Sequence, residues 1–288
     1  MATVTPTEAT RAGVAPRWRL RVLGSARVPD RLALAALALV LLVAIFGPFF
    51  EPHNPRLAAG LPFQSPNGAF PFGTDDAGRD MLSAGLSGLQ LTMLSGIAIV
   101  GVGLLIGGTV GLIAGSAGGL LDSVLMRITD LFLALPAPVL AIAVVAAFGP
   151  SLFHTLIAIS IFWWPYYARL IRAEVKAFAA RPHMEAVRLA RVSRARRLLR
   201  HLLPGAIPTA IVAASLDIGA AITLLASLSF LGLGAQPPTP ELGSLTAQGF
   251  ANLQTGWWLA VIPGVLVFVV VLVANLAGDA IRDILERR

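Results

Sequence analysis

Long apolar blocks alternate with short polar segments along this chain. Only Gly149, Pro150 and Ser151 separate the third block from the fourth, which predicts a helical hairpin. The first block is too long, and too poorly followed by a cleavage site, for a signal peptide. The pattern therefore predicts an all-α integral membrane protein with six transmembrane helices, because each block approaches the ~20 residues that a helix needs to cross a bilayer. The predicted spans are Leu32–Phe50, Leu89–Ala114, Leu131–Phe148, Leu152–Leu170, Pro208–Leu233 and Trp257–Ala277.

The composition agrees with a membrane environment. Of the 288 residues, 56% are hydrophobic and only 13% are charged, whereas soluble domains carry about 25% charged residues. The chain has no cysteine, which excludes disulfides, thiolate metal sites and iron–sulfur clusters. Its net charge of +7 is better explained by basic cytoplasmic loops than by binding to nucleic acid.

Basic residues lie almost entirely on one side of the predicted spans. Of the 22 Lys and Arg residues, only Arg56 and Arg79 fall on the other side. By the positive-inside rule, both termini and segment 173–207 are predicted to be cytoplasmic. The chain as a whole is predicted to lie in the inner or plasma membrane of a cell. Residues 1–30 would form a cytoplasmic tail, residues 31–288 the membrane domain, and segments 51–88 and 235–256 extracytoplasmic loops.

Segment 173–207 is too long for a simple turn between two spans. Its apolar residues, among them Met184, Val187 and Leu189, alternate with arginines. This pattern predicts two short amphipathic helices, broken near Val192–Ser193 and ended at Pro204. Such a segment lies on anionic lipid, stays solvated or docks onto a soluble partner, and the pattern alone leaves these alternatives open.

A run within this segment resembles a known loop. Residues 183–191 read His-Met-Glu-Ala-Val-Arg-Leu-Ala-Arg and precede His-Leu-Leu-Pro at 201–204, which is similar to the EAA loop of ABC-importer permeases. Glu185 and Ala186 match the family triplet, and Val187 replaces its second Ala. Arg191 stands where the family has a Gly, which puts the geometry of the turn in question. The resemblance implies that these four residues couple the chain to a partner ATPase.

Four further segments resemble signatures of the dipeptide, oligopeptide and nickel permeases. Segment 72–80 reads Phe-Gly-Thr-Asp-Asp-Ala-Gly-Arg-Asp, similar to an FGTDxxGRD signature. Segments 122–130, 227–241 and 275–283 resemble the family's D…MRxxD, LSFLGLG…PPTPEWG and NLxGDxxRD signatures, with Leu242 in place of the Trp. The motifs run in the family's order from about residue 30 to the C-terminus and come closest to the second permease subunit of dipeptide importers.

The first of these signatures defines a candidate extracytoplasmic site. The resemblance implies that a binding protein docks on this side, where the turns place Asp75, Asp76, Asp80 and Glu241. As individual acids we expect these to be solvated or structural rather than interfacial. The predicted signature-loop residues are Gly73, Asp75, Asp76, Gly78, Arg79 and Asp80.

The chain lacks the motifs of an enzyme. Lys176, the only lysine, follows Val175, so no phosphate-binding GxxxxGK[ST] loop exists. The sequence contains neither an HExxH pair nor a GxSxG nucleophile elbow. We therefore predict no catalytic residue, bound cofactor or metal site, and we expect ATP and Mg²⁺ to be used by a separate ATPase.

Taken together, the motifs resemble those of a type I ABC-importer permease with a cytoplasmic coupling helix. This implies a pore-forming subunit that receives di- or oligopeptides from an extracytoplasmic binding protein. The implied partners are a homologous second permease, ATPase subunits, that binding protein and the lipid bilayer. A nickel chelate or haem is the alternative ligand. A secondary transporter or a scaffolding protein is the alternative class, although ion coupling usually requires several ionisable groups within the membrane.

Asp217 is the main acidic residue inside a predicted span. It lies nine residues beyond Pro208, or roughly 13 Å along a helix. A carboxylate at that depth costs several kcal/mol unless it is paired, hydrated or protonated. Two interpretations follow: Asp217 pairs with a polar group on a neighbouring helix, or it faces the pore and contacts water or the ligand's amino group.

Overall fold

A computed structural model describes residues 27–190 and 192–286, without the side chains of His183, Ala186, Arg188 and Arg194. The regular secondary structure of the described residues is helical, apart from one isolated antiparallel bridge between Thr74 and Asp80. Of the sequence predictions, most of the N-terminal tail, the Arg191 position and the Ala186 side chain lie outside the described part.

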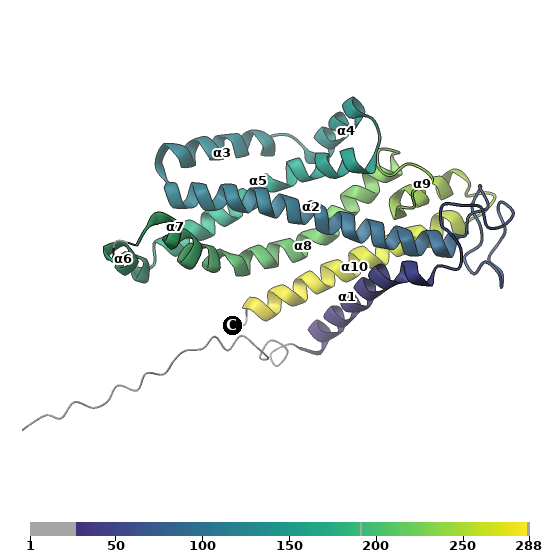
Figure 1. Cartoon of the computed structure of the whole chain (residues 1–288), viewed down its shortest axis with the longest axis horizontal. Helices are drawn as coiled ribbons and strands as arrows, with labels where there is room; N and C mark the ends of the chain where they lie inside the picture. The colour runs from purple at the N-terminus through teal and green to yellow at the C-terminus, as the bar shows by residue number, and fades with distance from the viewer. Residues whose placement is uncertain (1–26, 191, 287–288) are drawn as a thin grey trace, which may run out of the picture.

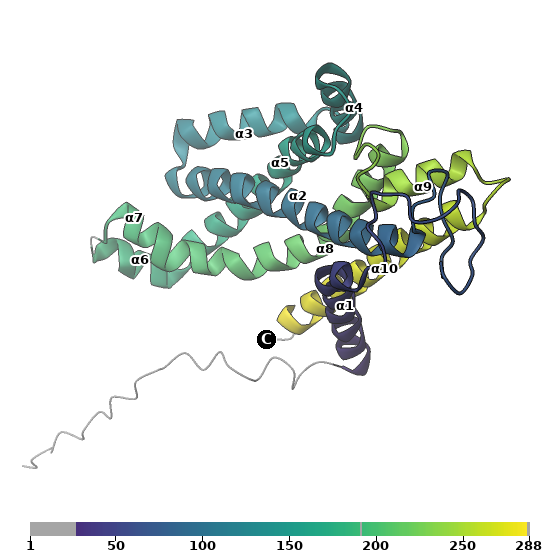
Figure 2. The same cartoon turned by 45° about the vertical axis from the view of Figure 1, so that its right-hand side comes forward.

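The helices form an elongated bundle in which α2, α5 and α8 run side by side (Figure 1). Helices α1 and α10 pack against each other along one flank, and α3 and α4 cover the other (Figure 2). The helices are α1 (Val28–Phe46), η1 (Gly47–Phe50), α2 (Met81–Ala117), α3 (Gly119–Leu133), α4 (Ala137–Phe148), α5 (Leu152–Ala179), α6 (Pro182–Leu189), α7 (Arg194–Arg197), η2 (Leu198–Leu202), α8 (Leu203–Phe230), α9 (Leu242–Ala251) and α10 (Trp258–Glu286).

Two predicted boundaries are wrong because acidic side chains cap helices earlier than the apolar pattern begins. Asp80 accepts hydrogen bonds from the backbone N–H groups of Leu82 and Ser83, each at 3.2 Å, so α2 begins at Met81 and the loop predicted as 51–88 ends at residue 80. Asp30 accepts one from the Arg27 N–H at 2.9 Å. Helix α1 therefore begins at Val28, inside the predicted tail of residues 1–30.

The third predicted span, Leu131–Phe148, is not one straight helix. The chain breaks between α3 and α4, which are bent by 81° relative to each other. Pro136 stands at the break and disfavours helical geometry at the preceding Leu135. The predicted hairpin is confirmed, because α4 ends at Phe148 and α5 begins at Leu152.

Helix length and composition identify four candidate membrane spans among the described residues, or five if α3 and α4 together count as one. The four segments are Val28–Phe50, Met81–Ala117, Ala195–Phe230 and Trp258–Glu286, with mean hydropathies of 2.7, 2.4, 2.0 and 2.8. Helix α5 has 28 residues but is not among them. Its hydropathy is lowered by an unusual set of polar and aromatic residues: His154, Trp163, Trp164, Tyr166, Tyr167 and Arg169.

Helices α2 and α5 form the most extensive helix pair, and glycines allow their close approach. Gly103, Gly107 and Gly111 repeat every four residues on the face of α2 that meets α5. A Cβ atom at Gly107 would lie 2.1 Å from the Trp164 carbonyl oxygen, and one at Gly111 would lie 2.6 Å from that of Ala168. Small residues at this spacing are typical of helix packing in membranes.

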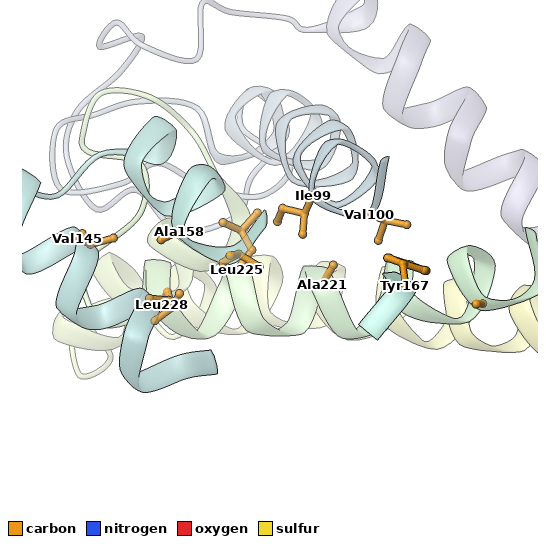
Figure 3. Packing of buried hydrophobic residues seen from close by; sticks show 11 residues of the cluster. Ile99, Val100, Val145, Ala158, Tyr167, Ala221, Leu225 and Leu228 are labelled. Atoms are coloured by element: carbon orange, nitrogen blue, oxygen red, sulfur yellow. The ribbon is translucent and has the colours of Figure 1, made fainter. Parts of the chain in front are cut away.

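The main apolar core lies where α2, α4, α5 and α8 meet (Figure 3). Ile99 from α2, Val145 from α4, Tyr167 from α5 and Leu225 from α8 are fully buried there. This core holds together segments more than 100 residues apart in the sequence.

The bundle has two distinct ends. The loop of residues 51–80 lies with α9 at one end, and α6 and α7 lie at the other (Figures 1 and 2). The first turn of α1 and the last turn of α10 lie close together in both views. The two predicted sites are therefore separated by the length of the bundle.

Candidate functional site

The loop of residues 51–80 is folded around Asp75. One oxygen of its carboxylate accepts the backbone N–H groups of Ala77 and Arg79 at 2.9 and 2.8 Å, and the other pairs with Arg79 Nε at 2.5 Å. The Arg79 guanidinium also donates to the Gln248 side chain on α9 at 3.4 Å. Asp75 is buried and thus organises the signature loop from within.

Gly73 and Gly78 are required by the same turn. Their φ angles are +74° and +76°, in a region that residues with a Cβ rarely adopt. A Cβ would also lie 2.6 Å from the Gln64 carbonyl oxygen at Gly73, and 2.3 Å from the Gly60 carbonyl oxygen at Gly78. Both glycines allow the loop to fold back on itself.

Two other acids on this side are helix caps. Asp80, fully buried, caps α2, accepts from the Ser83 hydroxyl at 2.6 Å and lies 3.4 Å from Nδ1 of His53. Glu241, also fully buried, caps α9 by accepting the backbone N–H groups of Gly243 and Ser244 at 3.0 and 2.9 Å. Both side chains therefore serve to cap helices.

Asp76 is the signature-loop acid that remains exposed. Its carboxylate lies 3.7 Å from the Arg79 guanidinium, and 49% of its side chain is accessible. At the start of the loop, burial raises the pKa of Glu51 above its ordinary value, and a hydrogen bond from the Ser87 hydroxyl partly opposes this effect. Asp76 is thus the acid of the predicted set whose carboxylate is accessible at the surface.

Ion pairs join α3 to α5 near the opposite end of the bundle. Asp122 on α3, only 5% exposed, accepts from Arg172 at 2.5 and 2.9 Å and from Lys176 at 2.6 Å. Two turns further along α3, Asp130 pairs with Arg169 at 2.5 Å in a more exposed position. The two acids of the segment 122–130 signature therefore fasten α3 to the part of α5 that leads into α6.

Met184 anchors helix α6 to the bundle. Met184 is 1% exposed and packs in an apolar cluster with Val175 and Leu202. Glu185 is exposed, and so is Leu189, whose exposed fraction is 84%. Residues four apart share a helix face, so Glu185 and Leu189 present one surface outward.

The predicted break near Val192–Ser193 agrees with the gap between α6 and α7, but the predicted end of the second helix at Pro204 is wrong. The helical backbone continues from α7 through the π-helical η2 into α8, and Pro204 lies in the first turn of α8. Proline is tolerated there because the first N–H groups of a helix have no intrahelical acceptor. Helix α5 likewise extends to Ala179, into the predicted loop of residues 173–207.

Asp217 lies on α8, partly buried, where it faces α5. The indole Nε1 of Trp163 donates to its carboxylate at 3.3 Å. The hydroxyl of Tyr167, one turn further along α5, is also buried close to Asp217. Asp217 thus has a polar partner on a neighbouring helix.

Comparison with known proteins decides the family. The chain matches the family described as the binding-protein-dependent transport system inner membrane component over residues 107–288. The chain is a member of this permease family. The match covers the bundle from the last third of α2 to the C-terminal end, including the predicted coupling loop.

Individual relatives of the permease extend the similarity toward the N-terminus. This chain is 39% identical over 253 residues to a probable D,D-dipeptide transport system permease protein of Escherichia coli (strain K12). The alignment covers 87% of this chain and 84% of that protein. The chain is 38% identical over 264 residues to a di/tripeptide transport system permease protein of Pseudomonas aeruginosa (strain UCBPP-PA14), covering 88% and 87%.

The fold agrees with solved ABC transporters. The permease resembles a chain of the inward-facing MetNI methionine ABC transporter structure with a TM-score of 0.58 at 18% identity. The match covers 71% of this chain and 97% of that one. An amino acid ABC transporter crystallised with histidines gives a TM-score of 0.55 at 19% identity, covering 71% and 94%. At such identities the likeness concerns the fold alone.

Several features of the permease were not found from the sequence. The partners of Asp217 and Asp122 lie on α5, 54 and 50 residues away, and no local pattern indicates such pairings. The sequence does contain a four-residue repeat of Gly103, Gly107 and Gly111, which indicates close helix packing. The prediction of helices from hydrophobic blocks did not use it.

Proposed function

We propose that this permease is the pore-forming subunit of an ATP-driven importer of di- or oligopeptides. The observation that carries the proposal is its similarity, over 84% and 87% of their lengths, to two permeases named for dipeptide and di/tripeptide transport. The ligand would be delivered by an extracytoplasmic binding protein, and a homologous second permease would supply the other half of the pore.

In the proposed topology, six spans cross the membrane. Two further spans, α5 and the bent α3–α4 pair, are added to the four spans that length and composition identify. Support for α5 comes from its position, because it packs against α2, α4 and α8 and has buried residues from Thr155 to Val175. A helix so enclosed by other helices needs fewer apolar residues than one that faces lipid on most sides.

The proposed orientation places α6 and α7 in the cytoplasm. Arg181, Arg196 and Arg200 are exposed at that end or close to it, and basic residues mark cytoplasmic loops. The start of α1 and the end of α10 lie close together, which fits both termini on one side of the membrane.

The proposed mechanism uses this chain as a moving element. Exposed Glu185 and Leu189 would contact the ATPase, which binds ATP and Mg²⁺, while Met184 keeps α6 attached to α5 and η2. The pairing of Asp122 with Arg172 and Lys176 would then carry α3 along with α5. Residues of this chain perform no covalent step; they transmit the motion and line half of the path.

On the opposite side, the loop of residues 51–80 would offer a rigid surface to the binding protein. Asp75, Arg79 and Gln248 tie it to α9, so the loop moves with the ends of α8 and α10. Exposed Asp76 would be the polar contact on this surface.

The test is ligand-stimulated ATP hydrolysis by the purified complex of this permease with its co-expressed partners. We expect the binding protein loaded with a di- or tripeptide to raise the hydrolysis rate several-fold, and the empty binding protein to do less. Stimulation by a nickel chelate or haem but by no peptide would overturn the assignment of the ligand.

A further inference from the structure

An apolar groove runs along the bundle between α2 and α8. Its volume is about 520 Å³, and its walls are almost wholly apolar. Leu105 and Thr109 on α2 and Ile207 on α8 are exposed along it. The groove also touches Ile171 on α5 and Leu199 on η2.

A smaller cavity of about 250 Å³ lies beyond the end of this groove. It is lined by Ser116 and Ala117 at the end of α2, and by Ala195, Arg197 and Leu198. Its lining is about half polar, in contrast to the groove. One helical turn separates Leu112, in the groove, from Ser116, in the cavity, and adjacent residues of η2 line the two spaces.

The cavity carries an uncompensated positive charge. Arg197 is partly buried there, and it forms no ion pair with any acid in the described ranges 27–190 and 192–286. Arg196 and Arg200, next to it in the sequence, are exposed and likewise unpaired within those ranges. Two cations on α5, Arg172 and Lys176, are paired with Asp122 instead.

The dimensions match one leaflet of a bilayer. Groove residues on α2 extend from Gly101 to Leu112, which is roughly 17 Å of helix at 1.5 Å per residue. Half of the hydrocarbon core of a bilayer is ~15 Å thick. An acyl chain in the groove would therefore place its headgroup at the cavity that contains Arg197.

We propose that the groove and the cavity together bind one anionic phospholipid, with an acyl chain between α2 and α8 and the phosphate beside Arg197. The charge of the cavity selects this occupant, because an apolar helix of another subunit would leave Arg197 unpaired. Basic pockets between membrane helices are suited to anionic headgroups. The proposal does not depend on the transported ligand, and it rests on the proposed orientation only for assigning the site to the cytoplasmic leaflet.

The test uses a fluorescent probe inside the groove. The chain has no native cysteine, so bimane attached to Thr109→Cys before assembly with unlabelled partner subunits reports on this one position. The complex is placed in vesicles that contain equal fractions of phosphatidylglycerol and phosphatidylcholine, with brominated acyl chains on one lipid or the other. Bromine quenches bimane on contact, and symmetric vesicles reveal the site in either orientation.

We expect brominated phosphatidylglycerol to occupy the groove about fivefold more favourably than brominated phosphatidylcholine, as one nearby arginine predicts. Arg197→Gln should remove this preference. Arg196→Gln is the matched control, because Arg196 is exposed and does not line the cavity; it should keep most of the preference. A bimane at Phe268→Cys, on the exposed face of α10, should be quenched equally by both lipids.

Three results would overturn the proposal. Equal quenching at position 109 by both lipids would make the groove an ordinary lipid-facing surface. Quenching at position 268 without any at position 109 would mean that another subunit covers the groove. Equal effects of Arg196→Gln and Arg197→Gln would attribute the preference to diffuse charge rather than to this cavity.

Discussion

Asp122 on α3 and Arg172 on α5 form a bidentate ion pair, with nitrogen–oxygen distances of 2.5 and 2.9 Å. Lys176, one turn along α5, donates to the same carboxylate at 2.6 Å. Because Asp122 is 5% exposed, its charge is stabilised chiefly by these two cations rather than by water. The pair fixes α3 against the segment of α5 that leads to α6.

Asp122→Asn should destabilise the permease. The substitution removes the charge that pairs with Arg172 and Lys176, and charge-assisted hydrogen bonds contribute about 1.5–3 kcal/mol each. We expect the melting temperature of the purified complex to fall by several degrees, measured as loss of the monodisperse peak in size-exclusion chromatography after heating.

Asp130→Asn provides the matched control for that prediction. Asp130 pairs with Arg169 between the same helices, but the two side chains are 44% and 53% exposed. Exposed pairs contribute about 0–1 kcal/mol, so this variant should melt close to the unmodified complex. Equal losses from both variants would contradict the special role of the buried pair.

Gly107→Ala should prevent the normal packing of α2 on α5. Its new Cβ would lie 2.1 Å from the Trp164 carbonyl oxygen, and relieving such overlap costs roughly 1–3 kcal/mol or more. The yield of folded permease in detergent should fall sharply. Gly108→Ala should leave the yield unchanged, because the nearest atom to its Cβ, on Leu104, is 4.0 Å away; a similar fall in both variants would refute the packing argument.

Asp217→Asn should retain both yield and uptake. The amide oxygen can still accept the hydrogen bond from Trp163, which the structure shows at 3.3 Å, so the pairing between α5 and α8 survives. Asp217→Leu removes that acceptor and should lower thermal stability. Loss of uptake at normal yield in Asp217→Asn would instead indicate that the charge serves the pore.

Glu185→Arg should uncouple transport from ATP hydrolysis. It reverses the charge on the exposed face of α6 that we assign to the ATPase contact, while Met184 still anchors the helix. Uptake should be lost, and the complex should assemble normally or more weakly. Unimpaired uptake by a well-expressed Glu185→Arg variant would rule out this face as the coupling surface.

The proposed orientation can be checked with a single cysteine. Ser193 is exposed between α6 and α7, and Ser193→Cys introduces the chain's sole thiol. An impermeant maleimide should label it in inverted membrane vesicles and not in intact cells. Labelling from outside intact cells would reverse the topology.

The sequence predicted the helices better than their ends and partners. Apolar blocks located the long helices because burial in a bilayer imposes ~20-residue segments. The start of α2 at Met81 escaped prediction because it depends on capping by Asp80, upstream of the apolar block. The bend at Pro136 was hidden in a continuous apolar run, since hydrophobicity alone does not distinguish a straight helix from a broken one.

The candidate sites divide in the same way. The motif of residues 72–80 identified a loop, but the burial of Asp75 and Asp80 within it was not predicted from the sequence. The pairing of Asp217 with Trp163 could not be predicted, because it depends on how α5 and α8 pack across 54 residues of sequence. Such long-range contacts are determined by tertiary packing, so no local sequence pattern indicates them.

The central claim is that this permease forms half of an ATP-driven peptide pore, and uptake by reconstituted vesicles tests it most directly. The complete complex would be placed in proteoliposomes with ATP inside or outside, and a radiolabelled dipeptide would be supplied with the binding protein. We predict accumulation that requires ATP on the side where α6 and α7 lie, requires the binding protein, and is lost in Glu185→Arg. Accumulation driven by an ion gradient without ATP, or no peptide transport by an intact complex, would contradict the account.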